Sequence, residues 1–308
     1  MRRSVVAVSI FLSLLPPLVC GAEVSDAGKG KMKAVLVTGA STGIGRKITE
    51  RLATDGYFVY AGARKDSDLK ALGAIKNVQA VRLDVTRPDD IEAARKLIEG
   101  GRLGLYGLVN NAGVVTIGNV LDTKMEEFDV VMSVNVYGPW RITRAFAPLI
   151  IASKGRITNI GSINGIISFA QAGAYSMSKH SIEAFTDALA QELAPLGVRV
   201  SVVEPGSYKS EIFRNEVQRA GTGTQLLDFA SHAKDPDEVA VAVEQALFDP
   251  NPKPRYMVVP EEQQARVTIR TQIEKLVELN EGQPYAYDRD TLVKMLDEAL
   301  VRKRPQGR

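Results

Sequence analysis

The sequence predicts an α/β fold: a doubly wound, mostly parallel sheet of seven strands with helices on both faces. Two observations lead to this fold class. Seven short apolar runs, rich in β-branched residues, have the composition of strands that are buried on both faces. These runs alternate with stretches of helical periodicity, which implies parallel βαβ units rather than hairpins. The expected strands span residues 34–38, 57–62, 78–83, 105–110, 155–160, 198–204 and 255–259.

The first strand is followed by a glycine-rich turn. A helical stretch then runs from Arg46 to about Asp55, with Gly56 as its C-cap. Strand, turn and helix together place backbone N–H groups and the positive end of a helix dipole where a pyrophosphate can bind. Glycine is needed because a side chain would hold the phosphates away from those N–H groups. A merely flexible turn is the alternative. The glycines of the turn are Gly39, Gly43 and Gly45.

The end of the second strand bears on the choice of nucleotide. Sites that bind NAD place an acidic side chain there to bind the ribose 2′-hydroxyl, whereas a 2′-phosphate requires an arginine. This chain has Arg64 shortly after the strand and no acid before Asp66. The pattern favours NADP(H), and NAD is the alternative if Arg64 is only a solvated loop cation.

A tyrosine and a lysine four residues apart, Tyr175 and Lys179, lie on one face of a predicted helix. A phenol has an ordinary pKa near ~10, too high for a base at neutral pH, and a neighbouring ammonium favours the phenolate and lowers that pKa. The spacing alone is weak evidence. It gains weight because Ser162 ends an apolar strand upstream, and because the stretch Asn110–Gly113 lies between that strand and the glycine turn.

The composition is that of one globular domain, with 308 residues of which 45% are hydrophobic and 24% are charged. A net charge of +3 with scattered basic residues argues against nucleic acid as a partner. Two histidines and one cysteine provide no cluster with metal-ligand spacing, so we expect no metal site.

Residues 1–22 have the three-part form of a secretory signal peptide: Arg2-Arg3, an apolar run, and a small-x-small cleavage site ending at Ala22. The run is too short for an ordinary membrane span, so we expect no stable span in the mature chain. Residues 23–31 are expected to form a flexible linker. The protein would then be exported to a periplasmic, secreted or lumenal location, and the arginine pair is compatible with export in the folded state. The alternative is translation from Met32 and a cytoplasmic protein.

These motifs, in this order, resemble the short-chain dehydrogenase/reductase family over residues 33 to about 260. The spacing T-G-x-x-x-G-I-G is that family's form of the phosphate loop in a Rossmann-like fold. The resemblance implies an NAD(P)-dependent oxidoreductase that acts on CH–OH groups. It also implies a tetrad in which Tyr175 is the acid/base and Ser162 binds the substrate oxygen. Lys179 would hold the nicotinamide ribose and lower the tyrosine pKa. Asn135 would hold a water in a proton relay that leads to Lys179.

The resemblance further implies a set of cofactor-binding residues at the glycine loop and at the ends of the strands. Asp84 and Val85 would contact the adenine, and Pro205 and Gly206 would lie beside the nicotinamide. One departure bears on cofactor choice: NADP-dependent members often carry a basic residue inside the loop, where this chain has Thr42. The implied set is Gly39, Ser41, Thr42, Gly43, Ile44, Gly45, Arg64, Asp84, Val85, Asn111, Ala112, Gly113, Tyr175, Lys179, Pro205 and Gly206.

Residues 175–206 are similar to the retinol and 17β-hydroxysteroid dehydrogenase branch of the family. This similarity implies a lipophilic ketone or secondary alcohol as the small-molecule substrate; alternatively, the helix sequence reflects subunit packing alone. The equivalent helices form a subunit interface in that family. The wide apolar stripes at 124–150 and 174–194 therefore predict a homodimer or homotetramer.

Residues 261–308 lie beyond the expected catalytic domain, 32–260. Helical periodicity at 264–279 and 289–300 predicts two helices, and together with the variable region 207–235 they are expected to cover the substrate side of the pocket. The alternative function is a non-catalytic nicotinamide-binding sensor or scaffold, which the intact tetrad argues against. A nucleotide-sugar epimerase or dehydratase would prefer a G-x-x-G-x-x-G loop and a longer C-terminal domain.

Overall fold

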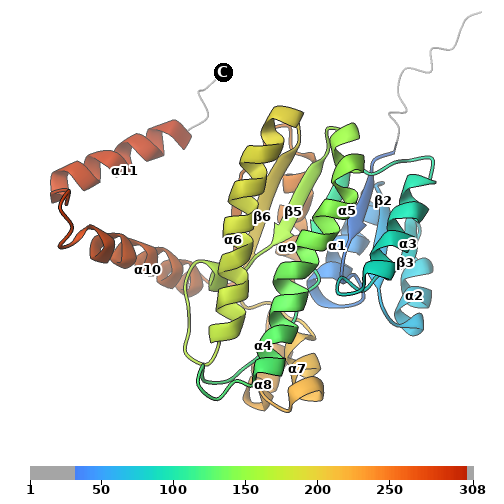
Figure 1. Ribbon diagram of the computed structural model, residues 1–308, viewed down its shortest axis with the longest axis horizontal. Helices are drawn as coiled ribbons and strands as arrows, with labels where there is room; N and C mark the ends of the chain where they lie inside the picture. Colours follow the sequence, from blue (N-terminus) through green and yellow to red (C-terminus); the bar gives the residue numbers. More distant parts are fainter. Residues whose placement is uncertain (1–31, 304–308) are drawn as a thin grey trace, which may run out of the picture. The chain divides into compact units, whose positions relative to one another are not determined.

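The computed structural model describes residues 32–303, and the expected signal peptide and linker (1–31) lie outside them. In this described part, seven parallel strands form one sheet in the order β3-β2-β1-β4-β5-β6-β7 (Figure 1), which confirms the predicted fold class. The strands are β1 (Ala34–Val37), β2 (Phe58–Ala63), β3 (Val78–Arg82), β4 (Gly107–Asn110), β5 (Arg156–Ile160), β6 (Arg199–Pro205) and β7 (Arg255–Val258).

The strand order reverses direction between β1 and β4, which are hydrogen-bonded neighbours although two strands separate them in the sequence. In an open parallel sheet, the loops at such a switch point diverge beyond the carboxyl ends of the strands and leave a crevice for a ligand. Here the two loops begin at Thr38 and Asn111, because β1 pairs with β4 up to Val37 and Val109. The fold thus places the glycine turn and the Asn110–Gly113 stretch at the same edge of the sheet.

The helices follow the expected pattern closely. α1 begins at Gly43 rather than Arg46, and Gly56 lies just beyond its end with the positive φ that favours glycine. The helices are α1 (Gly43–Thr54), α2 (Asp66–Gly73), α3 (Pro88–Glu99), α4 (Met125–Met132), α5 (Gly138–Ala152), α6 (Gly173–Leu193), α7 (Ile212–Ala220), α8 (Leu227–His232), α9 (Asp237–Phe248), α10 (Glu262–Asn280) and α11 (Arg289–Lys303).

Two hydrophobic cores lie on opposite faces of the sheet. Alternate residues of β1 contribute to each of them, because successive side chains of a strand point to opposite faces. Val35 and Val37 belong to the core that includes α1 and α9, and Ala34 and Leu36 belong to the core that includes α3 and α5. Burial on both faces explains why the central strands are almost uniformly apolar, whereas the edge strand β3 carries the exposed Gln79 and Arg82.

The helix expected at 124–150 is interrupted. α4 and α5 are joined by a five-residue π-helix, Ser133–Tyr137, which contains Asn135. A π segment inserts one extra residue into a helix and occurs often at functional sites. The Asn135 side chain explains what holds it in place: Oδ1 accepts a hydrogen bond from Val114 N (2.9 Å) and Nδ2 donates one to Val114 O (2.9 Å).

The two expected C-terminal helices are present as α10 and α11. Near its start α10 contacts the loop after β6, where Gln264 Oε1 accepts a hydrogen bond from Ser207 N (2.9 Å). Further along, Gln272 donates to Ile166 O. Among the described residues, no helix combines the length and apolar character required to cross a membrane.

Candidate active site

A cavity opens at the carboxyl edge of the sheet and is lined by the loops after β1, β2, β3, β4, β5 and β6. It brings together most of the residues that the sequence singled out. Two of them, Gly43 and Asn135, do not line it. The predicted residues in the lining are Gly39, Ser41, Thr42, Ile44, Gly45, Arg64, Asp84, Val85, Asn111, Ala112, Gly113, Ser162, Tyr175, Lys179, Pro205 and Gly206.

The glycine loop is fixed against the loop after β4. Thr38 Oγ1 accepts hydrogen bonds from the backbone N–H groups of Asn111 (3.0 Å) and Ala112 (3.1 Å), and Asn111 Nδ2 donates to Thr38 O (2.9 Å) and Gly39 O (3.0 Å). Gly39 has φ +65°, and a Cβ there would lie 2.8 Å from Ala112 Cα. Only glycine satisfies both conditions. We call the loop Gly39–Gly45 the glycine cradle. Held in this way beside the N-terminus of α1, it fits a pyrophosphate.

Arg64 stands at the end of β2, as expected, with its side chain 66% exposed. Its Nη1 lies 3.7 Å from Asp84 Oδ2. Burial would raise the pKa of Asp84, but hydrogen bonds from Thr86 and the charge of Arg64 outweigh it, so the net shift is downward. Arg64 therefore lines the cavity beside a carboxylate, which partly neutralises its positive charge.

The predicted catalytic side chains meet at the ends of β5 and α6. Lys179 Nζ donates a hydrogen bond to Ile160 O (2.9 Å) and lies 5.6 Å from the centre of the Tyr175 ring. Ser162 Oγ accepts from Asn164 N (3.1 Å) and makes a long bond of 3.4 Å to Pro205 O. The Ser162 hydroxyl hydrogen is thus weakly engaged and can turn toward a substrate oxygen.

The electrostatics of Tyr175 differ from the expectation. Burial raises its pKa to about 12, and a hydrogen bond with Ser162 acts in the opposite direction. Burial also lowers the pKa of Lys179 to about 8, against the charge of Glu183. The expected lowering of the tyrosine pKa by the lysine is absent here, because desolvation dominates and the ammonium is directed at Ile160 O. At neutral pH, Tyr175 is a neutral phenol that can donate its proton.

Asn135 contributes from behind the cavity wall. Besides its two bonds to Val114, its Nδ2 donates to Ser178 Oγ (2.9 Å), so both Nδ2 hydrogens are used, whereas Oδ1 accepts one bond and can accept a second. The side chain therefore has no hydrogen left to donate to a ligand. The water relay to Lys179 stays an expectation from the resemblance.

Among the further residues that line the cavity are four that the sequence did not single out individually. Ile212, Phe213 and Asn215 of α7 line the cavity, as does Asn164 after β5. The segment 207–235 was expected to cover the substrate side of the pocket together with residues 261–308, but without named residues. Of the described residues in these two regions, only those of the first contribute to the cavity lining. The apolar pair Ile212-Phe213 at the start of a short helix is the one local signal that could have indicated a substrate wall.

Comparison with known proteins identifies the family. The short chain dehydrogenase family model matches residues 33–221. The chain belongs to this family. Its matched part is 41% identical over 186 residues to mitochondrial D-beta-hydroxybutyrate dehydrogenase of Bos taurus, covering 57% of this chain and 54% of that protein. It is 38% identical over 184 residues to retinol dehydrogenase 5 of Mus musculus, covering 58% and 57%. The chain thus matches little more than half the length of these curated relatives.

Solved structures agree in fold over most of the chain. A short-chain dehydrogenase from Streptomyces avermitilis has a TM-score of 0.71 and 30% identity, and the match covers 81% of this chain and 96% of that one. A short chain dehydrogenase from Burkholderia cenocepacia in complex with NADP has a TM-score of 0.66 and 26% identity, with 82% and 99% coverage. Fold and family thus agree with the resemblance that the sequence motifs indicated.

Proposed function

We propose that this protein is an oxidoreductase that transfers a hydride between NADP(H) and a carbonyl or alcohol, with a lipophilic ketone or secondary alcohol as substrate. The observation that carries the proposal is the meeting of Ser162, Tyr175 and Lys179 in a cavity whose other side is the glycine cradle at Gly39. A nicotinamide bound there supplies or accepts the hydride.

Side chains of the protein transfer the proton and orient the substrate oxygen. Tyr175, neutral at working pH, donates its hydroxyl proton to the oxygen during reduction and recovers it during oxidation. Ser162 Oγ orients that oxygen, because its long bond to Pro205 O is easily exchanged for a shorter one. Lys179 Nζ donates one N–H to Ile160 O and lies near the tyrosine ring, so its two other N–H groups can hold a ribose hydroxyl.

NADP(H) is favoured over NAD(H) by Arg64. It lines the cavity at the end of β2, where a site specific for NAD would carry an acid. The similarity to the Burkholderia structure in complex with NADP supports the same choice. Asp84 weakens this preference for NADP(H), because its carboxylate partly neutralises the positive charge of Arg64.

A lipophilic substrate is favoured over a small hydroxy acid by the lining of the cavity. Ile163, Ile212 and Phe213 are apolar, and the cationic residues of the lining in the described part are Arg64 and Lys179. Arg64 lies at the cofactor end and Lys179 serves the tyrosine. A substrate carboxylate would therefore lack a cation. This argument favours a substrate more like that of the retinol dehydrogenase relatives than that of the hydroxybutyrate dehydrogenases.

The same proposal includes a homodimer or homotetramer. Tyr137 at the end of the π-helix, Trp140 at the start of α5 and Met177 on α6 are each more than half exposed. Large apolar side chains gathered on neighbouring helices are typical of a subunit interface.

Export by the N-terminal segment, with a cytoplasmic protein starting at Met32 as the alternative, is likewise proposed from the sequence. N-terminal sequencing of the natural protein tests it, since Glu23 or Met32 at the terminus selects one route.

A direct assay tests the activity. The protein is mixed with NADPH or NADH and a panel of aliphatic and cyclic ketones, and the absorbance of the reduced nicotinamide is followed. We expect turnover with NADPH and lipophilic ketones. Tight NADPH binding without turnover of any ketone or alcohol would instead indicate the non-catalytic sensor.

A further inference from the structure

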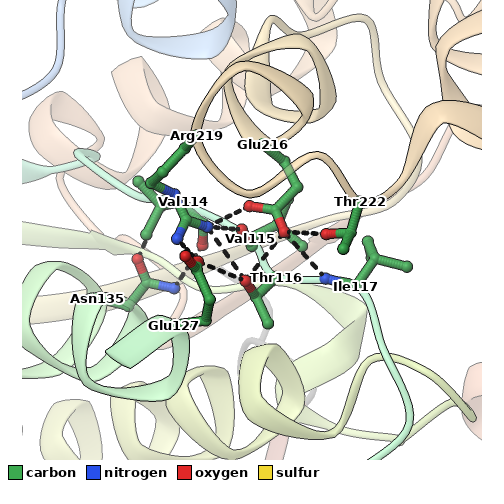
Figure 2. Close-up of polar contacts among 9 residues, drawn as sticks. All are labelled: Val114, Val115, Thr116, Ile117, Glu127, Asn135, Glu216, Arg219 and Thr222. Atoms are coloured by element: carbon green, nitrogen blue, oxygen red, sulfur yellow. Dashed lines mark hydrogen bonds and ion pairs between the residues drawn. The ribbon is translucent and has the colours of Figure 1, made fainter. Parts of the chain in front are cut away.

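We infer that Glu216 and Arg219 of α7 are positioning residues for the substrate pocket, because they clamp this helix to the segment that also holds Asn135. The inference rests on the proposed function only in taking the α7 side of the cavity as the substrate side. Its structural basis is a network of polar contacts between α7, α4 and the segment Val114–Ile117 (Figure 2).

Glu216 is a buried carboxylate with an unusually complete set of donors. Its side chain is 0% exposed. Its oxygens accept hydrogen bonds from Thr222 Oγ1 (2.6 Å), Thr116 Oγ1 (2.9 Å) and Ile117 N (3.3 Å), and from Arg219. Burying a carboxylate is costly unless it is paired and hydrogen-bonded, so this arrangement is specific to one position of α7.

Arg219 adds contacts to the same segment and extends the network to α4. Its Nη2 donates to Val115 O (2.7 Å) and to Thr116 Oγ1 (3.1 Å), and the guanidinium forms ion pairs with Glu127 of α4 and with Glu216. A planar guanidinium can satisfy several acceptors at fixed angles, which a lysine ammonium cannot reproduce. Arg219 therefore fixes the orientation of α7 as well as its distance from the loop after β4.

The segment bound by this pair is continuous with the catalytic side. Val114, next to Val115, exchanges both of its backbone hydrogen bonds with Asn135. Figure 2 shows Asn135 on one side of the segment and Glu216 and Arg219 on the other. The α7 wall and the Asn135 side chain are thus held by the same short stretch of chain, Val114–Ile117.

The consequence is that α7 acts as a fixed wall, because its second half is clamped while its first half supplies Ile212 and Phe213 to the cavity. Loosening the clamp would let that apolar wall move. The hydrogen bonds between Val114 and Asn135 do not involve Arg219. Loss of Arg219 should therefore weaken substrate binding more than it slows the chemical step.

The chain offers a matched control on the same helix. Arg214 pairs with Glu211 at 2.9 Å, with exposed fractions of 66% and 37% for the two side chains. This pair has the same i,i+3 spacing as Glu216 and Arg219 but remains at the surface, where such pairs contribute little. Arg214→Ala should therefore leave α7 in place.

The test has two arms that use the full-length protein. In the first, amide hydrogen exchange is followed across residues 212–220 in the unmodified protein, in Arg219→Ala and in Arg214→Ala. We expect faster exchange only in Arg219→Ala, by about tenfold or more, because opening of α7 becomes easier. Unchanged exchange would overturn the clamp, and this arm needs no substrate.

In the second arm, steady-state kinetics are measured with NADPH and two cyclic ketones of different size, cyclododecanone and cyclohexanone. Arg219→Ala should raise KM for the larger ketone by about tenfold. The kcat should stay within about threefold and the dissociation constant for NADPH within about twofold. Arg219→Lys should give an intermediate KM, since it keeps the charge without the planar fork. Kinetics indistinguishable from Arg214→Ala would overturn the positioning role.

The outcomes separate the two proposals. If the unmodified protein turns over no ketone, the proposed function fails, and the exchange arm still decides the clamp. If Arg219→Ala does not fold, Arg219→Lys and Glu216→Gln carry both measurements, because each preserves the volume of the side chain. Exchange at the unmodified rate in both of these variants would again contradict the clamp.

Discussion

Replacement of Arg64 by alanine isolates the contribution of one side chain to cofactor choice. A charge-assisted hydrogen bond contributes about 1.5–3 kcal/mol. Arg64 is two-thirds exposed and has Asp84 3.7 Å from its guanidinium, so its pull on a 2′-phosphate is screened and shared. We therefore expect the lower end of the range, about 1.5 kcal/mol, which is roughly a tenfold loss of NADPH affinity.

Fluorescence titration of the reduced cofactor measures this effect directly, without any substrate. Arg64→Ala should weaken NADPH about tenfold and leave NADH nearly unchanged. Asp84→Asn should strengthen NADPH, because it frees the arginine. Arg87 provides the matched control: its side chain is also 66% exposed and is paired with an aspartate, but it lies outside the cavity lining. Equal affinity of the unmodified protein for NADPH and NADH would refute the reasoning.

Three further predictions address the cradle, the buried charges and the assembly. Gly39→Ala should abolish measurable cofactor binding in the same titration while the protein stays folded by circular dichroism, since a Cβ there would lie 2.8 Å from Ala112 Cα. Burial, and then the charge of Glu183, raise the pKa of Glu204 to about 7 from its ordinary 4.5. Its stabilising contribution is therefore full below about pH 4.5 and is lost as pH rises to about 7. Glu204→Gln should flatten this dependence by up to about 3 kcal/mol in denaturant unfolding. Light scattering at micromolar concentration should give a dimer or tetramer, and Trp140→Glu should shift it toward monomer without loss of fold.

The sheet was predictable because its central strands are buried on both faces and are nearly unbroken apolar runs, and because the edge strands β3 and β7 still carry apolar residues between turn signals. The expected and observed strands therefore agree to within one or two residues. Among the helices, the stretch from α4 to α5 differs from the expectation. There the π segment at Ser133–Tyr137 was not foreseen, because helical periodicity over a window hardly changes when one residue is added.

Most residues of the cavity lining were predictable because each lies in a short motif at the end of a strand or along one helix. The clamp was not. Glu216 and Arg219 have the same spacing as Glu211 and Arg214, and only the tertiary fold buries one pair and exposes the other. The direction of the Tyr175 pKa shift was misjudged for a related reason, since spacing places Lys179 nearby but does not reveal how far both groups are desolvated.

The most direct test of the account is the turnover of Tyr175→Phe. The ring still packs at the same place and the glycine cradle is untouched, so the dissociation constant for NADPH should stay within about twofold. The proton donor is gone, so kcat for ketone reduction should fall by about a hundredfold or more. Turnover close to that of the unmodified protein, with NADPH bound equally well, would contradict the assignment of Tyr175 as the acid/base and with it the proposed reaction.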